Sequence, residues 1–304
     1  TALDRLECQC FLLPAGLSRA EITRHASQFQ LAAILLDKQA MMPESPSADD
    51  RSAGSLHSAG RVVLLTSGTS GGPKAAMHTW ASLASGIHVS GKLRGWRMLL
   101  SYDVARYAGV QVLLTALLNG AALCVPPSRQ MPDIVRTIVE QGVQFVSGTP
   151  TFWRMLLANS GPEHWAKMPL RQVTLGGEIV NQPLLDALRA AFPAARITHI
   201  YASTEMGVCF SVHDCREGFP ADFLDSDSLP VRLKARDGRL WIRSKRSMEG
   251  YLAGSDGPAA GAVEQVRDRW FDTGDAVEVV GDRVFFRGRE SSRINVGGEK
   301  VYPE

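Results

Sequence analysis

The chain has 304 residues, of which 45% are hydrophobic and 21% charged, so it holds enough apolar material for a large folded core. Its formal net charge of +2 gives no reason to expect nucleic acid or another polyanion as a partner. The five cysteines are odd in number and irregularly spaced, which favours reduced thiols over disulfides or a metal site. No apolar run is long enough to span a membrane, so we expect a cytoplasmic protein without a membrane partner.

The first 60 residues predict a short β/α unit followed by a loop. A strand is expected at residues 10–13, and a helix then runs to residue 29. Ser18 and Glu21 have the spacing of a capping box, which marks the start of that helix. Residues 31–36 form an apolar run typical of a buried strand. Residues 38–60 are rich in Pro, Ser, Asp and Gly and predict a linker or surface loop.

From Arg61 onward the pattern alternates between strands and helices. Strands are expected at 62–65, 98–101, 121–125, 143–147, 173–175 and 197–201, and helices at 75–89, 110–118, 133–141, 151–157 and 182–191. Such alternation is typical of an α/β fold with mostly parallel sheets flanked by helices. We therefore predict an α/β core over residues 1–220.

The pattern changes after about residue 220. Asp237-Gly238 separates two strand-like runs, and so does Gly281-Asp282. Both dipeptides are typical of tight β-hairpin turns. We therefore expect a small antiparallel β subdomain over residues 221–290.

The strongest local motif lies directly after the strand expected at 62–65. It reads Thr66-Ser67-Gly68-Thr69-Ser70-Gly71-Gly72-Pro73-Lys74. Glycines let backbone N–H groups converge on an anion, hydroxyls add donors, and a lysine adds positive charge, so this loop suits a phosphate. A Walker loop ends in Gly-Lys-Ser/Thr, whereas here Pro73 precedes Lys74 and Ala75 follows it. The alternative reading is a flexible Gly/Ser turn without a ligand.

Two further motifs follow predicted strands, at Gly176-Gly177-Glu178 and at Tyr201-Ala202-Ser203-Thr204-Glu205. Ligands of parallel sheets bind beyond the carboxyl ends of the strands, so these two segments and the phosphate-loop motif, three strand ends in all, should face one crevice. Glu205 could hold Mg²⁺ together with phosphate oxygens, although a lone loop carboxylate is more often simply solvated. Tyr201 could stack on a base, although a lone aromatic residue is more often part of the core. Thr273-Gly274-Asp275 and Gly288-Arg289 are weak signals by themselves.

Together and in this order, the five motifs resemble those of the adenylate-forming superfamily, which includes acyl- and aryl-CoA synthetases, luciferases and peptide-synthetase adenylation domains. The resemblance implies that the cofactors are ATP and Mg²⁺. It implies that the loop holds the β- and γ-phosphates, that Gly176, Gly177, Glu178 and Tyr201 lie around adenine, and that Asp275 and Arg289 bind the ribose. It further implies that Thr204 contacts the α-phosphate and that Glu205 is the metal ligand. The nucleotide-binding residues implied in this way are Thr66, Ser67, Gly68, Thr69, Ser70, Gly71, Gly72, Lys74, Gly176, Gly177, Glu178, Tyr201, Thr204, Asp275 and Arg289; those assigned to catalysis are Lys74, Thr204 and Glu205.

The acid-binding side departs from the family pattern. Arg106 stands where the family often has His or an aromatic residue, and it could attract a carboxylate. Tyr107, Thr149 and Trp153 are expected to line the remainder of the acid pocket.

The resemblance implies activation of a small carboxylic acid as acyl-AMP, followed by transfer to CoA or to an acyl carrier protein. The segment Gly297-Gly298-Glu299-Lys300-Val301-Tyr302-Pro303 is similar to the one that follows the hinge in acyl- and aryl-CoA ligases. Residues 291–304 are accordingly expected to be the hinge and the start of a mobile C-terminal domain. Without that domain the chain is expected to adenylate slowly and to form no thioester. The alternative function is a non-catalytic module that binds ATP or AMP.

Overall fold

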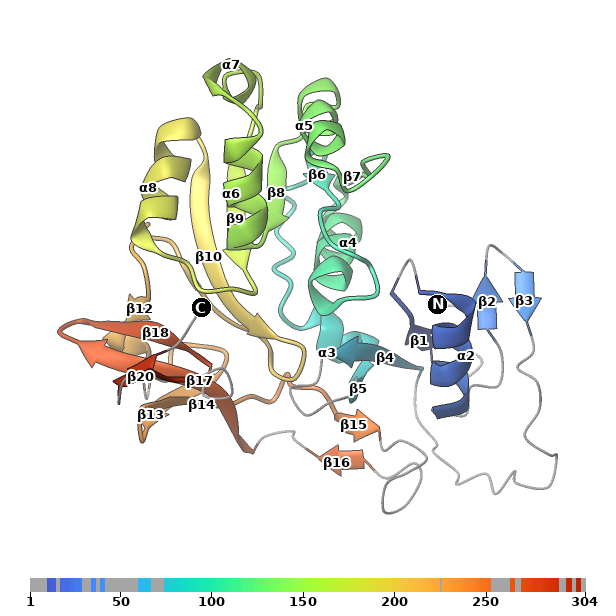
Figure 1. Ribbon diagram of the computed structural model, residues 1–304, viewed down its shortest axis with the longest axis vertical. Helices are drawn as coiled ribbons and strands as arrows, with labels where there is room; N and C mark the ends of the chain where they lie inside the picture. The colour runs from blue at the N-terminus through green and yellow to red at the C-terminus, as the bar shows by residue number, and fades with distance from the viewer. Residues whose placement is uncertain are drawn as a thin grey trace.

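The protein is described by a computed structural model, in which residues 10–14, 17–28, 34–36, 39–41, 60–66, 74–224, 226–252, 263–265, 269–289, 294–296 and 299–301 are placed. Figure 1 shows a six-stranded sheet with its helices in the upper part and an antiparallel sheet below it. Within the described segments, no helix is both long and apolar enough to cross a membrane.

The central sheet has the strand order β11-β10-β9-β8-β6-β7. Its strands are β6 (Arg97–Leu99), β7 (Ala122–Cys124), β8 (Phe145–Gly148), β9 (Gln172–Gly176), β10 (Arg196–Ser203) and β11 (Gly207–Val212). All neighbours are parallel except β11, which turns back antiparallel along β10. Its helices are α4 (Tyr107–Asn119), α5 (Met131–Glu140), α6 (Pro150–Ala158), the one-turn α7 (Pro162–Trp165) and α8 (Gln182–Ala191).

Helices cover both faces of this sheet. Successive side chains of a strand point to opposite faces, so Met98 and Leu99 of β6 face different helices. Met98 packs with Val112 and Ala116 of α4, whereas Leu99 packs in the cluster formed by α5, α6 and α8. The predicted α/β fold class, with a mostly parallel sheet flanked by helices, is therefore confirmed.

The phosphate-loop motif is anchored in a second sheet, of order β1-β4-β5-β15-β16. Its strands are β1 (Cys10–Leu12), β4 (Arg61–Thr66), β5 (Lys74–Thr79), β15 (Gly250–Leu252) and β16 (Val263–Gln265). Of the helix predicted at 75–89, only residues 80–84 are helical. Its first residues instead form β5, which pairs with β4 on one side and β15 on the other. The helix-favouring Ala75 and Ala76 are both buried, so sheet pairing overrides local propensity. A helix follows only at α3 (Trp80–Ala84), where Thr79 and Ser82 form a capping box.

The predicted antiparallel subdomain forms the third sheet, of order β12-β18-β17-β14-β13. Its strands are β12 (Phe219–Pro220), β13 (Arg232–Arg236), β14 (Arg239–Arg243), β17 (Trp270–Val280) and β18 (Arg283–Arg289). Both predicted hairpins are confirmed, with Arg236 opposite Arg239 and Val280 opposite Arg283. Asp237 and Gly238 have φ of 52° and 71°, the left-handed values that a two-residue turn of this kind requires.

The remaining elements are short: α2 (Arg19–Gln28), the 3₁₀ turn at Ala221–Phe223, and the hairpins β2 (Ile34–Leu36)–β3 (Gln39–Met41) and β19 (Ile294–Val296)–β20 (Glu299–Val301). The capping box predicted for α2 is present. The Ser18 backbone N–H donates to the Glu21 carboxylate at 2.8 Å, and the Glu21 N–H donates to Ser18 Oγ at 3.3 Å.

Candidate functional site

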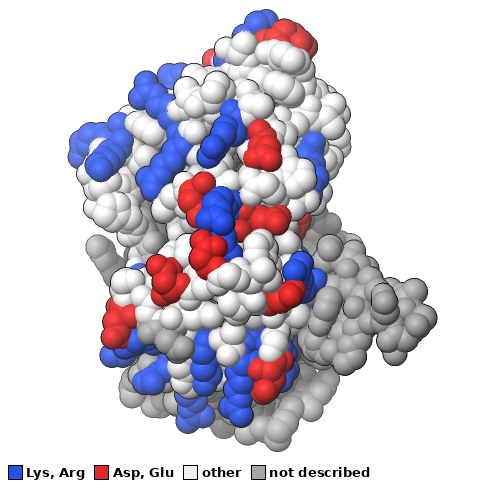
Figure 2. Space-filling model, turned by 90° about the vertical axis from the view of Figure 1, so that its left-hand side faces the viewer, with Lys and Arg blue, Asp and Glu red and all other residues white. Residues whose placement is uncertain are grey.

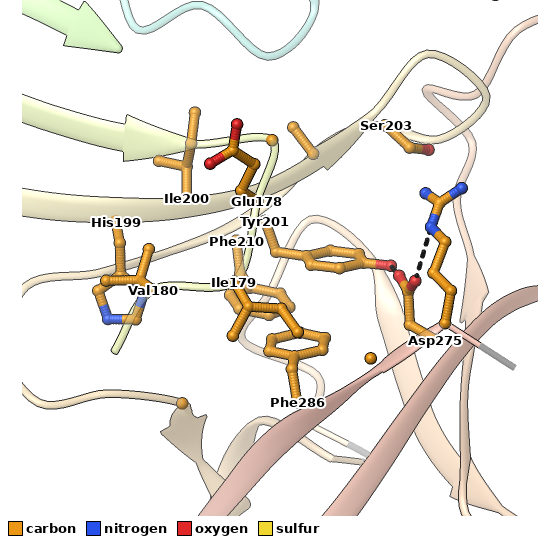
Figure 3. A pocket seen from close by; sticks show the side chains of 15 residues that line it. Glu178, Ile179, Val180, His199, Ile200, Tyr201, Ser203, Phe210, Asp275 and Phe286 are labelled. Carbon is orange, nitrogen blue, oxygen red and sulfur yellow. Dashed lines mark hydrogen bonds and ion pairs between the residues drawn. The ribbon is translucent and has the colours of Figure 1, made fainter. Parts of the chain in front are cut away.

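A cleft that is partly open to solvent lies where the carboxyl ends of β9 and β10 meet β17 and β18 (Figure 3). This is the edge of a parallel sheet at which ligands are expected. The cleft is lined by Gly177, Glu178, Ile179, Val180, His199, Ile200, Tyr201, Ala202, Ser203, Phe210, Gly218, Asp275, Phe286, Gly288 and Arg289. Residues of four of the five sequence motifs therefore meet here although they are far apart in the chain.

Asp275 is the charged centre of the cleft. The Tyr201 hydroxyl donates to Asp275 Oδ2, and Arg289 Nε lies 3.2 Å from Oδ1 (Figure 3). Asp275 and Arg289 are cross-strand partners in the β17–β18 hairpin, so sheet pairing sets their contact. Because each carboxylate oxygen has two lone pairs, Asp275 can still accept hydrogen bonds from a ligand's hydroxyls.

Tyr201 is held by aromatic rings as well as by Asp275. Its ring stacks with Phe210 at 5.4 Å and with Phe286 at 5.0 Å between centroids. Burial and the adjacent Asp275 charge raise the pKa of the Tyr201 phenol well above its ordinary value. The phenol is therefore a fixed donor to Asp275, and the ring is a rigid wall of the cleft.

The glycine pair brings the backbone of the turn after β9 close to its surroundings. A Cβ at Gly176 would lie 2.8 Å from Ile200 Cγ1, and Gly177 has φ of 84°. The adjacent Glu178 carboxylate accepts hydrogen bonds from the Thr151 N–H at 2.9 Å and from the Thr151 hydroxyl at 2.7 Å. Glu178 is thereby attached to the first turn of α6, at the side of the cleft.

The turn after β10 is fastened to the second sheet. The Thr204 carbonyl lies 2.9 Å from His78 Nε2, and the Glu205 carbonyl accepts from the Met248 N–H at 2.9 Å. The Glu205 side chain accepts a hydrogen bond from the Tyr251 hydroxyl, with 2.5 Å between Oη and Oε1. The positions of Thr204 and Glu205 therefore depend on β5 and β15 as well as on β10.

His78 should make stability depend on pH. Burial lowers the pKa of its imidazole from 6.5 to about 4, although the Thr204 carbonyl and the Glu205 charge oppose the shift. As the pH falls, His78 is therefore protonated near pH 6.5 in the unfolded chain but only near pH 4 in the native state. The contribution of neutral His78 is full above pH 6.5, and we expect about 2–3 kcal/mol of unfolding free energy to be lost between pH 6.5 and 4.

Denaturant titrations across this pH range test the expectation. His78→Gln keeps a donor near the Nε2 position but cannot titrate, so its stability should fall less steeply with acid. The exposed His164 of α7 supplies the control variant, His164→Gln. Parallel pH profiles for the wild type and His78→Gln would contradict the assignment.

The structure describes only the two ends of the phosphate-loop motif. Thr66 and Lys74 face each other across β4 and β5, and the Thr66 hydroxyl lies 3.4 Å from the Lys74 carbonyl oxygen. The exposed Lys74 ammonium lies 5.2 Å from the centroid of the Tyr251 ring. The intervening candidates, Ser67, Gly68, Thr69, Ser70, Gly71 and Gly72, lie outside the described residues.

The donor set near Glu205 suits a Mg²⁺ ion that is also held by phosphate. The Tyr251 hydroxyl donates to Glu205 Oε1, and no described residue donates to the other carboxylate oxygen, Oε2. Among the residues placed in the structure there is no group of three or more His, Cys, Asp or Glu side chains that could hold a metal alone. Mg²⁺ is usually bound by one or two carboxylates plus substrate phosphates, and Glu205 fits that pattern.

Of the four residues predicted to line the acid pocket, two are accessible to solvent and two are buried. Arg106, exposed at the start of α4, donates to the Leu65 carbonyl at 3.1 Å, and Thr149 caps α6 close to Gly177. Tyr107 is instead buried in the core beneath β4. Trp153 is fully buried and donates from Nε1 to the Thr174 carbonyl at 3.0 Å. The structure therefore brings Arg106 and Thr149 to accessible positions, while Tyr107 and Trp153 pack inside.

Comparisons with known proteins identify the family. The chain belongs to the AMP-binding enzyme family, whose model matches residues 36–252. It is 31% identical over 252 residues to 2-succinylbenzoate–CoA ligase of Salmonella typhimurium, an alignment covering 80% of this chain and 50% of the ligase. It is 27% identical over 276 residues to surfactin synthase subunit 1 of Bacillus subtilis, covering 79% of this chain and 8% of that protein. The chain thus spans about half the length of the CoA ligases it matches.

Solved structures share the fold. An anthranilate CoA ligase in complex with anthranoyl-AMP is similar with a TM-score of 0.63 and 21% identity, over 80% of this chain and 49% of that one. An o-succinylbenzoate CoA synthetase from Bacillus subtilis, in complex with ATP and magnesium ion, has a TM-score of 0.54 and 20% identity, over 80% of this chain and 52% of that one.

Proposed function

We propose that the chain binds MgATP and a carboxylic acid and joins them as acyl-AMP. The observation that carries the proposal is the cleft in which Asp275, Arg289, Tyr201 and the glycine turn meet. Asp275 offers acceptors for ribose hydroxyls, and the turn after β10 leads from this end of the cleft to Thr204 and Glu205. The family and the acyl-AMP and MgATP complexes of its structural neighbours support the same reading.

In the proposed reaction a carboxylate oxygen attacks the α-phosphorus of ATP. The bond from that phosphorus to the bridging oxygen of the β-phosphate breaks, and pyrophosphate leaves with the bonding electrons. Lys74 places a positive charge beside the departing β- and γ-phosphates, and Thr204 contacts the α-phosphate. Glu205 would hold Mg²⁺, which would supply positive charge to neutralise the phosphate oxygens. The protein mainly orients the two substrates for in-line attack.

The acid and the acceptor are the finer parts of the proposal. Arg106 and Thr149, at accessible positions, are the candidates to meet the acid. We propose a thiol acceptor in the whole protein, either CoA or a carrier protein, because the relatives include both CoA ligases and peptide synthetases. A cytoplasmic location belongs to the same proposal.

A non-catalytic module that binds ATP or AMP is the competing function, since the contacts of the cleft account for a nucleoside and not for the acid. Mass spectrometry of reactions with ATP, Mg²⁺ and a panel of carboxylic acids separates the two. The proposal predicts an acyl-AMP peak with at least one aliphatic or aromatic acid, and no such peak when Mg²⁺ is withheld. Binding of MgATP without acyl-AMP from any acid would favour the binding module.

A further inference from the structure

Tyr251 lies between the two charged side chains that the proposed function assigns to MgATP. It comes from β15, where it pairs with Ala76 of β5 in antiparallel register. Its hydroxyl donates to Glu205 Oε1 at 2.5 Å, and its ring centroid lies 5.2 Å from Lys74 Nζ. One aromatic side chain thus contacts both an anion and a cation of the site.

The register of β5 explains why these groups meet. Lys74, Ala76 and His78 alternate along the strand, so their side chains share one face. Tyr251, directly opposite Ala76, projects on that same face, and Lys74 is its diagonal neighbour. His78 reaches the Thr204 carbonyl from this face. The small side chain of Ala76 leaves room between its two larger neighbours.

Lys74 and Glu205 carry opposite charges, yet the structure, which describes both side chains, records no ion pair between them. Tyr251 supplies an alternative partner to each. Its hydroxyl occupies one Glu205 oxygen and leaves Oε2 for a metal, while its ring attracts the ammonium without neutralising it. The Glu205 carboxylate and the Lys74 ammonium therefore do not neutralise each other and can bind the metal and the phosphates of a ligand.

We propose that Tyr251 is a positioning residue for MgATP, which orients the Glu205 carboxylate toward Mg²⁺ and holds the Lys74 ammonium beside the β- and γ-phosphates. The inference rests on the proposed function, because it needs MgATP to bind in this cleft. AMP lacks the β- and γ-phosphates and does not need the metal. The role of Tyr251 should accordingly be selective for MgATP.

Two variants separate the hydroxyl from the ring. Tyr251→Phe keeps the ring and should raise the Mg²⁺ concentration for half-maximal ATP binding about 10-fold, the low end for a hydrogen bond to a charged group. Tyr251→Leu should in addition lower ATP affinity at saturating Mg²⁺ by about 2–5-fold, from loss of the cation–π contact. AMP affinity should stay within about 2-fold of the wild-type value in both variants, because AMP lacks the β- and γ-phosphates and does not need the metal. Unchanged AMP binding also shows that the cleft of each variant is folded.

The measurement is calorimetric titration of ATP at a series of Mg²⁺ concentrations, with AMP titrated alongside. A double-mutant cycle that combines Tyr251→Phe with Glu205→Gln gives the sharper readout. In the Glu205→Gln background, Tyr251→Phe should have no further effect on the Mg²⁺ dependence of ATP binding. Tyr102→Phe, which removes the hydroxyl of a tyrosine near Ser147, is the control and should behave as the wild type.

The outcomes distinguish the positioning role of Tyr251 from the proposed function on which it rests. A wild-type protein that fails to bind MgATP would remove the proposed function and the role of Tyr251 with it. A wild type that binds MgATP while Tyr251→Phe keeps its Mg²⁺ dependence would overturn the positioning role alone. Equal losses for AMP and MgATP would show that Tyr251 acts only on the structure.

Discussion

Asp275→Ala should weaken the binding of adenosine, AMP and ATP by the same factor, roughly 10²-fold. The carboxylate is proposed to accept the ribose hydroxyls, and losing a hydrogen bond to a charged group costs about 1.5–3 kcal/mol. The substitution also leaves the Tyr201 hydroxyl and the Arg289 guanidinium without their partner in the cleft. Calorimetric titration of the three ligands measures the effect.

The matched control is Asp282→Ala, which removes an exposed carboxylate from the turn of the same β17–β18 hairpin. It should bind all three ligands as the wild type does. Wild-type adenosine affinity in Asp275→Ala would place Asp275 outside the nucleotide site. A loss for ATP that adenosine does not share would assign Asp275 to the phosphates instead.

Lys74→Ala should weaken MgATP by roughly 10–100-fold and leave AMP nearly unchanged. The reason is that the ammonium is proposed to contact only the β- and γ-phosphates, and a lost charged hydrogen bond costs about 1.5–3 kcal/mol. Its position at the start of β5, opposite Thr66, places it at the end of the loop that should carry those phosphates. Parallel titrations of ATP with Mg²⁺ and of AMP give the two affinities.

Lys92→Ala removes an exposed lysine elsewhere on the surface and serves as the control for net charge. It should leave both affinities at wild-type values. Equal losses of ATP and AMP in Lys74→Ala would contradict the assignment, because they would show that Lys74 supports the fold or the nucleoside.

Much of the fold follows from local pattern. Helix α8 has the predicted bounds 182–191, because Asn181 caps it and its apolar residues repeat at helical spacing. The two hairpins follow from Asp237-Gly238 and Gly281-Asp282, whose turn chemistry is local. The helix predicted at 75–89 failed because β5 gains its stability from β4 and β15, the latter about 175 positions further along the chain.

The site divides in the same way. The turns after β9 and β10 meet in one cleft as the strand-end argument predicts, since parallel strands place their carboxyl ends at a common edge. The phosphate-loop motif instead follows β4 of the second sheet, and its residues 67–73 lie outside the described residues. Tyr107 and Trp153 could not be told from core residues, because an aromatic side chain in a helix has the same local signal in either role.

Local pattern does not predict Tyr251 and His78 as site residues, because neither lies in a motif and both reach the site through pairing of distant strands. The alternation of Lys74, Ala76 and His78 is a signal for this shared face only when β5 is a strand. Lys74 and His78 share a face in a helix as well as in a strand, but only the two-residue period of a strand places Ala76, and the Tyr251 opposite it, on that face.

The most direct test of the central claim is acid-dependent exchange of labelled pyrophosphate into ATP. Acyl-AMP formation is reversible, so a chain that makes acyl-AMP returns label to ATP only when an accepted acid is present. We expect such exchange with the wild type, much slower exchange with Asp275→Ala, and none without acid. A wild type that binds MgATP but exchanges no label with any acid of the panel would contradict the claim that this chain activates carboxylic acids.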